Sequence, residues 1–209
     1  MGVASGLALS YFPARFLVAG DAAATAARIA AAPMLYRLWM VSDLATEVGY
    51  VYLAITLYAL FRDVDRNQAR VLVAMILVQV PMWSTFTVLK LVPRVLSNGS
   101  GYLSVIDKPQ LDALAMASLV WLDRSVGALS AYWGLWLVPF GLLVYRSGFI
   151  PRLLGVVVLA AAGAYLLSAA TYFFFPAYYA TVFWAAAPFY GLGELGIIGW
   201  LLIKGARES

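Results

Sequence analysis

The 209-residue chain contains neither cysteine nor histidine. Without cysteine it has no disulfides, no thiolate nucleophile and no sulfur ligand for a metal ion. Without histidine it cannot form a Ser-His-Asp triad, a histidine-ligated zinc site or the usual axial ligation of a haem. Most familiar catalytic arrangements are thereby excluded, so we expect a protein that is not an enzyme, and no cofactor is evident.

Charged residues are also scarce. They make up 11% of the chain, whereas 64% of residues are hydrophobic and the mean hydropathy is +0.88. Residues 153–193 carry no charge at all, although about 20 residues already suffice to cross the hydrocarbon core as a helix. This stretch must therefore reverse direction, and we expect the reversal at Pro176. The composition predicts an integral membrane protein surrounded by the lipid bilayer.

The predicted fold is an all-α polytopic membrane helix bundle, a single integral membrane helical domain over residues 1–209. It has about six transmembrane helices, of which the first, containing Pro13 and Arg15, is short. Five of the crossings are expected at about residues 2–19, 35–61, 71–91 with a kink at Pro81, 153–176 and 181–203. The remaining one, fourth in chain order, follows an interfacial segment and ends at residue 145. A charged loop at 62–70 and a basic loop at 146–152 connect some of them.

Short interfacial helices are expected on the outer side. Asp21 can cap an alanine-rich helix that ends near Pro33, because its carboxylate can accept from the free N–H groups of the first turn. A second interfacial segment, 111–120, follows a helix start near Pro109. Between these, the triplet Asn98-Gly-Ser100 fits a glycosylation acceptor, but its composition favours a turn.

The formal net charge of +4 comes mainly from bases at helix ends and connections, which is typical of membrane anchoring. No basic run is interleaved with exposed aromatic residues, so binding of nucleic acid is not expected. Lys and Arg are denser in 62–70, 146–152 and the tail from 204 than on the opposite side. This bias predicts that both termini lie in the cytoplasm.

Several segments carry a family resemblance: Gly20-Asp-Ala-Ala-Ala-Thr-Ala26, Val41-Ser-Asp-Leu44, Leu57-Tyr-Ala-Leu-Phe-Arg62 and Tyr145-Arg-Ser-Gly-Phe-Ile-Pro-Arg-Leu-Leu-Gly155. They resemble the bacterial membrane family catalogued as domain of unknown function number 4386, over nearly the whole chain from Gly6 onward. The Arg-Ser-Gly-Phe-Ile-Pro-Arg loop is the most specific piece. The resemblance implies a six-helix protein of the bacterial inner membrane and assigns no activity. Relative to the family, the first crossing of this chain looks clipped.

Ionisable residues inside apolar runs form the candidate site: Asp43, Glu47, Lys90, Asp123, Arg124 and Glu194. A charge at the bilayer centre costs about 2.5 to 3.5 kcal/mol on insertion scales, so such groups tend to face protein or water and to be functional. Asp43 and Glu47 lie one helical turn apart and repel each other, so a proton or cation is expected between them. Lys90 and Arg124 are available partners.

Two explanations of these charges remain open. In the first, Asp43, Glu47, Asp123, Arg124 and Glu194 line an outward-facing polar cavity. In the second, the charges form interhelical ion pairs, with the basic side chains reaching the outer interface. Interhelical hydrogen bonds average only about 0.6 kcal/mol, so pairing alone is a weak use of groups that are costly to insert.

The segment Gly191-Leu-Gly-Glu-Leu-Gly196 around Glu194 matches the dinucleotide fingerprint G-x-G-x-x-G. That fingerprint requires a preceding strand and a βαβ unit, whereas this copy lies in a predicted membrane helix. Small residues let membrane helices approach closely. We therefore expect the glycines to pack against the small-residue run at 160–164.

Two functions follow from these patterns. In the first, the protein binds or conducts a small polar ligand, cation or proton through the outward-facing cavity; nothing supplies a spaced set of metal ligands. In the alternative, it is an accessory or structural subunit whose aromatic and small-residue faces pack against other membrane proteins or pigments in a larger complex.

Overall fold

The computed structural model describes residues 6–98 and 101–205, which are almost entirely helical and contain no strand. Five helical spans in these ranges are long and apolar enough to cross a membrane: Pro33–Phe61, Arg66–Ser97, Lys108–Arg146, Arg152–Phe174 and Pro176–Lys204. The prediction of an all-α polytopic membrane fold is thereby confirmed. The described residues provide five such spans, against the six expected.

The chain forms two compact units: Met1–Val51 with Gln79–Ser125, and Tyr52–Val78 with Val126–Ser209. Helices α4 (Pro33–Phe61) and α7 (Lys108–Arg146) contribute residues to both units. Of the charged residues predicted for the site, Glu194 belongs to the second unit and the other five to the first.

The predicted first crossing, 2–19, is the one missing from the five spans. Its residues 2–5 lie outside the described chain. The described part forms a π-helical turn, η1 (Leu7–Tyr11), followed by α2 (Phe12–Phe16). At 1.5 Å per residue these ten residues extend about 15 Å, roughly half the thickness of the hydrocarbon core. The helix then ends because Leu17 is extended, with φ −72° and ψ 130°.

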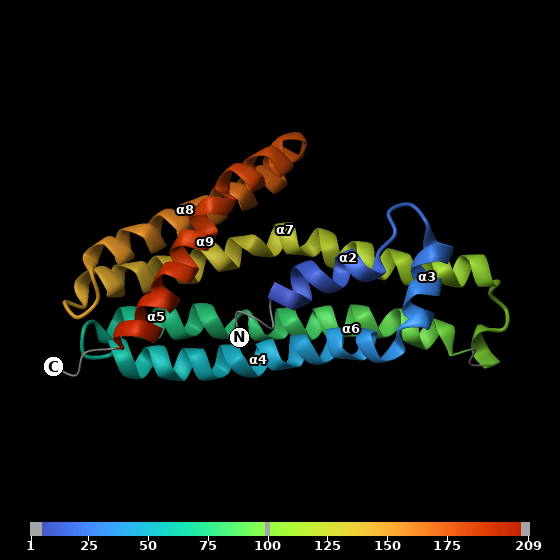
Figure 1. Ribbon diagram of the computed structural model, residues 1–209, viewed down its shortest axis with the longest axis horizontal. Helices are drawn as coiled ribbons and strands as arrows, with labels where there is room; N and C mark the ends of the chain where they lie inside the picture. Colours follow the sequence, from blue (N-terminus) through green and yellow to red (C-terminus); the bar gives the residue numbers. More distant parts are fainter. Residues whose placement is uncertain (1–5, 99–100, 206–209) are drawn as a thin grey trace. The chain divides into compact units, whose positions relative to one another are not determined.

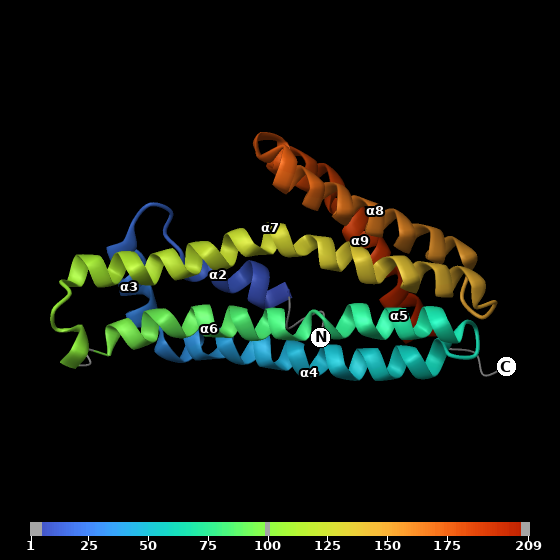
Figure 2. The ribbon, with the colours of Figure 1, turned by 180° about the vertical axis from the view of Figure 1, so that it is seen from behind.

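In the first unit, α3 (Ala22–Ala31) begins as predicted, because the Asp21 carboxylate accepts from the N–H of Ala24 at 2.8 Å. The first half of α4 lies beside α6 (Val80–Ser97), as Figures 1 and 2 both show. The Tyr36 hydroxyl donates to the carbonyl of Lys90 at 2.9 Å, which ties the two helices together.

The helix α5 (Arg66–Leu77) belongs to the second unit and begins earlier than expected. The Asp65 carboxylate accepts from the N–H groups of Asn67 and Gln68, so the helix starts inside the loop that was predicted over 62–70. The sequence predicts a kink at Pro81, and two turn residues, 78 and 79, separate α5 from α6 just before it. Proline suits the first turn of α6, where no N–H bond is lost.

Two other expectations concern the connections. Helix α7 is continuous over its 39 residues, so no break separates an interfacial segment at 111–120 from the crossing that follows. Two residues of the Asn98-Gly-Ser100 triplet, 99 and 100, lie outside the described chain, as does the tail from 206 onward.

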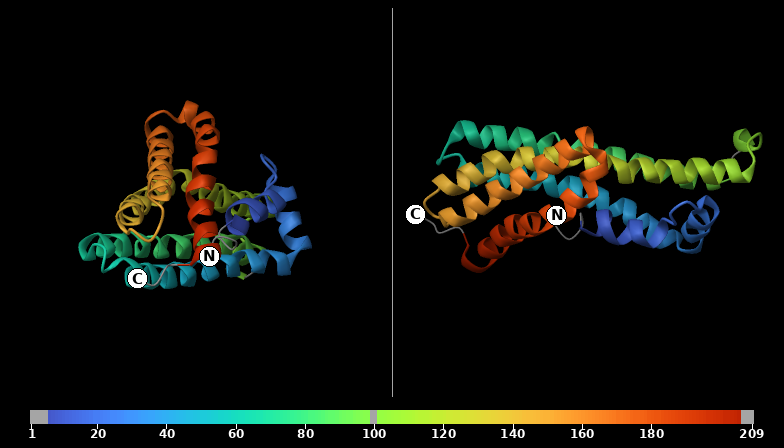
Figure 3. Two further views of the ribbon diagram at one scale, coloured as in Figure 1. Left: turned by 60° about the vertical axis from the view of Figure 1, so that its left-hand side comes forward. Right: turned by 90° about the horizontal axis from the view of Figure 1, so that it is seen from above.

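A helical hairpin dominates the second unit. Helix α8 (Arg152–Phe174) and helix α9 (Tyr179–Lys204) run in opposite directions and are joined by η3 (Pro176–Tyr178), as Figure 3 shows. The reversal at Pro176 is therefore confirmed. A Cβ placed on Gly193 would lie 2.5 Å from the Cβ of Ala161, so this glycine packs on the 160–164 run as predicted, whereas a Cβ on Gly191 would meet nothing within 4 Å and one on Gly196 would meet Leu154.

Candidate functional site

Two of the predicted residues meet in the first unit. Lys90 on α6 donates from Nζ to Oδ2 of Asp43 on α4 at 2.5 Å, and the two side chains are 1% and 0% exposed. A buried charge is tolerated only when an opposite charge and further hydrogen bonds compensate it. The structure therefore selects Lys90 as the partner of Asp43.

The residues around this ion pair come from the same two helices. Lys90 Nζ lies 4.5 Å from the centroid of the Trp39 ring, a cation–π distance. Thr87, one turn before Lys90, donates to Asp43 Oδ2 at 3.3 Å. Thr87 is not among the predicted site residues, although it lies three residues before Lys90 and so shares its helical face, as Trp39 does with Asp43.

Glu47 lies one turn beyond Asp43 on α4, as its spacing predicts, and its side chain is half-buried. Its Oε1 atom is buried and accepts no hydrogen bond, and the same is true of Asp43 Oδ1. A buried acceptor left unsatisfied costs about 1–3 kcal/mol, and more when it is charged. The site thus holds two buried carboxylate oxygens that accept no hydrogen bond, beside a single ammonium group.

Asp123 and Arg124 occupy a different environment. Both side chains are exposed on α7, and within residues 6–98 and 101–205 neither forms an ion pair or a hydrogen bond with Asp43, Glu47 or Lys90. The structure therefore does not bring these two residues to the buried pair. The cluster in the first unit consists of Asp43, Glu47 and Lys90.

Glu194 lies in the second unit with partners of its own. The Tyr165 hydroxyl on α8 donates to Glu194 Oε1 at 2.7 Å. The rings of Tyr165 and Tyr190 stack with centroids 4.0 Å apart, and Tyr190 shares a 2.5 Å hydrogen bond with Ser168. A half-buried carboxyl group is thus held by a stacked tyrosine pair, which sequence spacing did not predict.

Two cavities occur in the second unit. One, of about 440 Å³, lies between the α7–α8 loop and the last turn of α9. The other, of about 400 Å³, is an apolar groove between α8 and α9. None of the six predicted site residues lines either cavity, and in the described chain no three acidic side chains gather as a metal site would require.

Long apolar helices, with charges withdrawn into an interhelical pair, define the class of a polytopic integral membrane protein. Residues 1–205 match the family described as a domain of unknown function (DUF4386), and the chain belongs to that family. The resemblance seen in the sequence is thereby confirmed. No curated protein and no solved structure matches the chain.

Proposed function

We propose that the protein binds or conducts a proton at the cluster of Asp43, Glu47 and Lys90. The observation that carries the proposal is the pair of buried oxygens, Asp43 Oδ1 and Glu47 Oε1, that accept no hydrogen bond. A proton on either carboxyl group turns an unsatisfied acceptor into a donor and removes one charge from the interior.

Charge balance favours a proton over the other ligands expected from the sequence. Two ionised carboxylates and one ammonium carry a net charge of −1, which one proton neutralises. Calcium takes about 6–8 oxygen ligands, and the Lys90 ammonium beside Asp43 repels any metal cation. A proton needs one oxygen and, at most, one neighbouring acceptor.

The proposal also covers location and class. We place the protein in the bacterial inner membrane, as a protein that is not an enzyme and uses no cofactor. The density of Lys and Arg in 62–70, 146–152 and the C-terminal tail supports a cytoplasmic C-terminal end. A cytoplasmic N-terminus as well would require a sixth crossing before α4, and the described residues supply five spans.

The first experiment compares Glu47→Gln with Asp123→Asn in the full-length protein reconstituted in liposomes. Infrared spectroscopy reports the carbonyl stretch of a protonated carboxylic acid, and an entrapped pH dye reports proton flux. We expect the wild type to show the protonated band and a proton response, and Glu47→Gln to lose both. Asp123→Asn removes an exposed acid and should leave both unchanged. Equal behaviour of the two variants would refute the proposal.

The competing proposal is an accessory subunit that packs against other membrane proteins or pigments. Large exposed aromatic side chains support it, among them Trp121 and Trp184, which are 64% and 73% exposed. Lipid tails would cover the same surfaces equally well, so this proposal ranks second. Purification in mild detergent distinguishes the two proposals, because a stable monomer without partners argues against a subunit role.

A further inference from the structure

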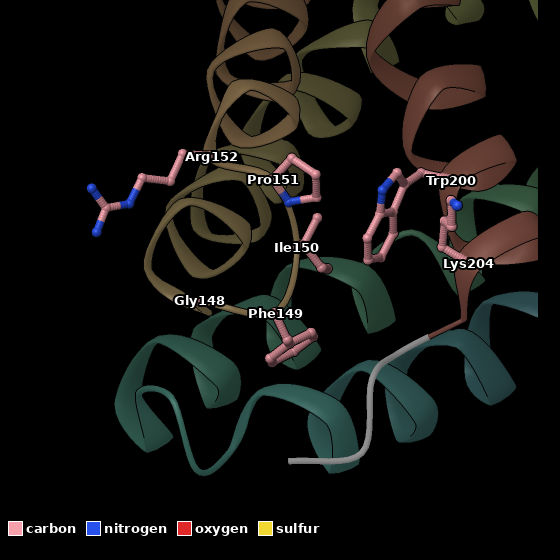
Figure 4. Close-up of a pocket in the computed structure, with 7 residues that line it drawn as sticks. All are labelled: Gly148, Phe149, Ile150, Pro151, Arg152, Trp200 and Lys204. Carbon is pink, nitrogen blue, oxygen red and sulfur yellow. The ribbon is translucent and has the colours of Figure 1, made fainter.

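The cavity between the α7–α8 loop and the end of α9 has features of a ligand site. Its walls are formed by 148–152 and by Trp200 and Lys204. Its volume of about 440 Å³ lies within the range of about 300–1,000 Å³ that is usual for small-molecule pockets. Figure 4 shows Ile150 and Pro151 on one side and the Trp200 indole facing them from the other.

The charge of this cavity is positive. None of its seven lining residues is acidic, and Lys204 stands beside Trp200 at the rim (Figure 4). Within residues 6–98 and 101–205, Lys204 forms no ion pair, whereas the nearby base Arg146 is paired with Asp65 at 3.3 Å. Lys204 is thus the base available to a ligand inside the cavity.

Arg152 contributes to the cavity wall without directing its charge inward. Its guanidinium points away from Trp200 in Figure 4 and lies 5.7 Å from the centroid of the Tyr145 ring. A ligand in the cavity would therefore meet one ammonium group and apolar walls. That combination fits an anionic group joined to an apolar body better than a free polar anion.

The position of the cavity along the helices indicates which kind of molecule with an anionic group and an apolar body would bind there. Trp200 and Lys204 occupy the last turns of α9, at the end of a membrane-spanning segment. Tryptophan and lysine at such positions lie at the level of the lipid headgroups, and basic pockets between membrane helices bind anionic headgroups. The lipid phase itself therefore supplies a ligand with the required chemistry.

We infer that this cavity is a binding site for an anionic phospholipid, with the lipid phosphate on Lys204 and the glycerol backbone between Trp200 and the 149–151 wall. The site is independent of the proposed proton cluster, because it is formed wholly by residues of the second unit.

The test uses the full-length protein in a neutral detergent with phosphatidylglycerol or phosphatidylcholine added. Native mass spectrometry counts the retained lipids, and the melting temperature gives a second measure. We expect the wild type to retain phosphatidylglycerol preferentially. Lys204→Gln should lower that preference about fivefold, as expected for one basic residue near an anionic surface. The control Lys108→Gln removes an exposed lysine of the first unit and should keep the preference.

A second variant, Trp200→Ala, removes the apolar wall while keeping the charge, and it should also weaken phosphatidylglycerol retention. Three results would overturn the inference: equal retention of the two lipids by the wild type, equal losses in Lys204→Gln and Lys108→Gln, or displacement of phosphatidylglycerol by millimolar inorganic phosphate. The last result would assign the site to a free anion.

Discussion

At the scale of single residues, the ion pair of Asp43 and Lys90 is the buried electrostatic contact that joins α4 to α6 in the first unit. Both charges are removed from water and lipid, so each depends on the other. A buried pair adds little net stability, but removing one partner leaves an uncompensated charge, which costs about 3–5 kcal/mol. The Tyr36 hydroxyl donates to the backbone carbonyl of Lys90, and the Lys90 ammonium lies over the Trp39 ring.

A double-mutant cycle tests this dependence. Lys90→Met leaves Asp43 without its cation, so we expect a loss of about 3–5 kcal/mol in the free energy of unfolding. The double variant Asp43→Asn/Lys90→Met should recover part of that loss. Unfolding in mixed detergent micelles provides the measurement. The matched cycle on the helical pair Lys108–Asp112, whose side chains are 79% and 15% exposed, should show a coupling of about 0.5 kcal/mol or less. Equal coupling in both cycles would contradict the role given to burial.

Part of this site could be predicted from the sequence. Asp43, Glu47 and Lys90 stand out because an ionisable group in an apolar run is costly wherever the helix lies. The choice between Lys90 and Arg124 as partner was beyond the sequence, since it depends on which helix faces meet. For the same reason, the exposure of Asp123 could not be predicted.

At the scale of elements, the hairpin of α8 and α9 depends on a close approach of two backbones. Gly193 and Ala161 leave room for nothing larger at their contact. The sequence predicted this contact, because small residues gather in both segments. It did not predict where α5 begins, since the side chain of Asp65 satisfies the N–H groups of the first turn and extends the helix into the charged loop.

Two glycine-to-alanine variants on α9 test the close approach of the α8 and α9 backbones. Gly193→Ala places a methyl group 2.5 Å from the Cβ of Ala161, and overpacking of this kind costs about 1–3 kcal/mol. Gly191 lies on the same helix with nothing within 4 Å of an added Cβ. Gly191→Ala should therefore be neutral or stabilising by up to about 1 kcal/mol. Thermal unfolding of the two variants compares them directly, and a larger loss at Gly191 would be inconsistent with this packing.

At the scale of the whole molecule, the number of crossings fixes which connections share a side of the membrane. Five crossings would place the segment before α4 and the segment after α9 on opposite sides, whereas six would place both on one side. Six crossings were predicted from the sequence because residues 2–19 are largely apolar. The described part of that segment is instead two short consecutive helical pieces, which end at the extended Leu17 and contact Trp39 of α4.

The absence of cysteine makes this topology simple to map. Single cysteines replacing Ala23, Ser104 and Ala177 should react with a membrane-impermeant maleimide on intact cells. Cysteines replacing Asp63 and Pro151 should react only after permeabilisation, because these positions follow an odd number of spans, whereas the other three follow an even number or none. Labelling of Ala23→Cys together with Asp63→Cys would show that α4 does not cross.

The position of Trp39 gives the molecule an optical reporter. Its indole N–H donates to the carbonyl of Ala8 at 2.8 Å, its ring stacks on Phe12 and Phe16, and its side chain is fully buried. Trp121 and Trp184 are exposed. In a variant that keeps Trp39 and replaces the other six tryptophans by phenylalanine, a brominated lipid that quenches fluorescence should leave the emission of Trp39 unchanged, so quenching would report that the segment carrying Ala8 has left α4.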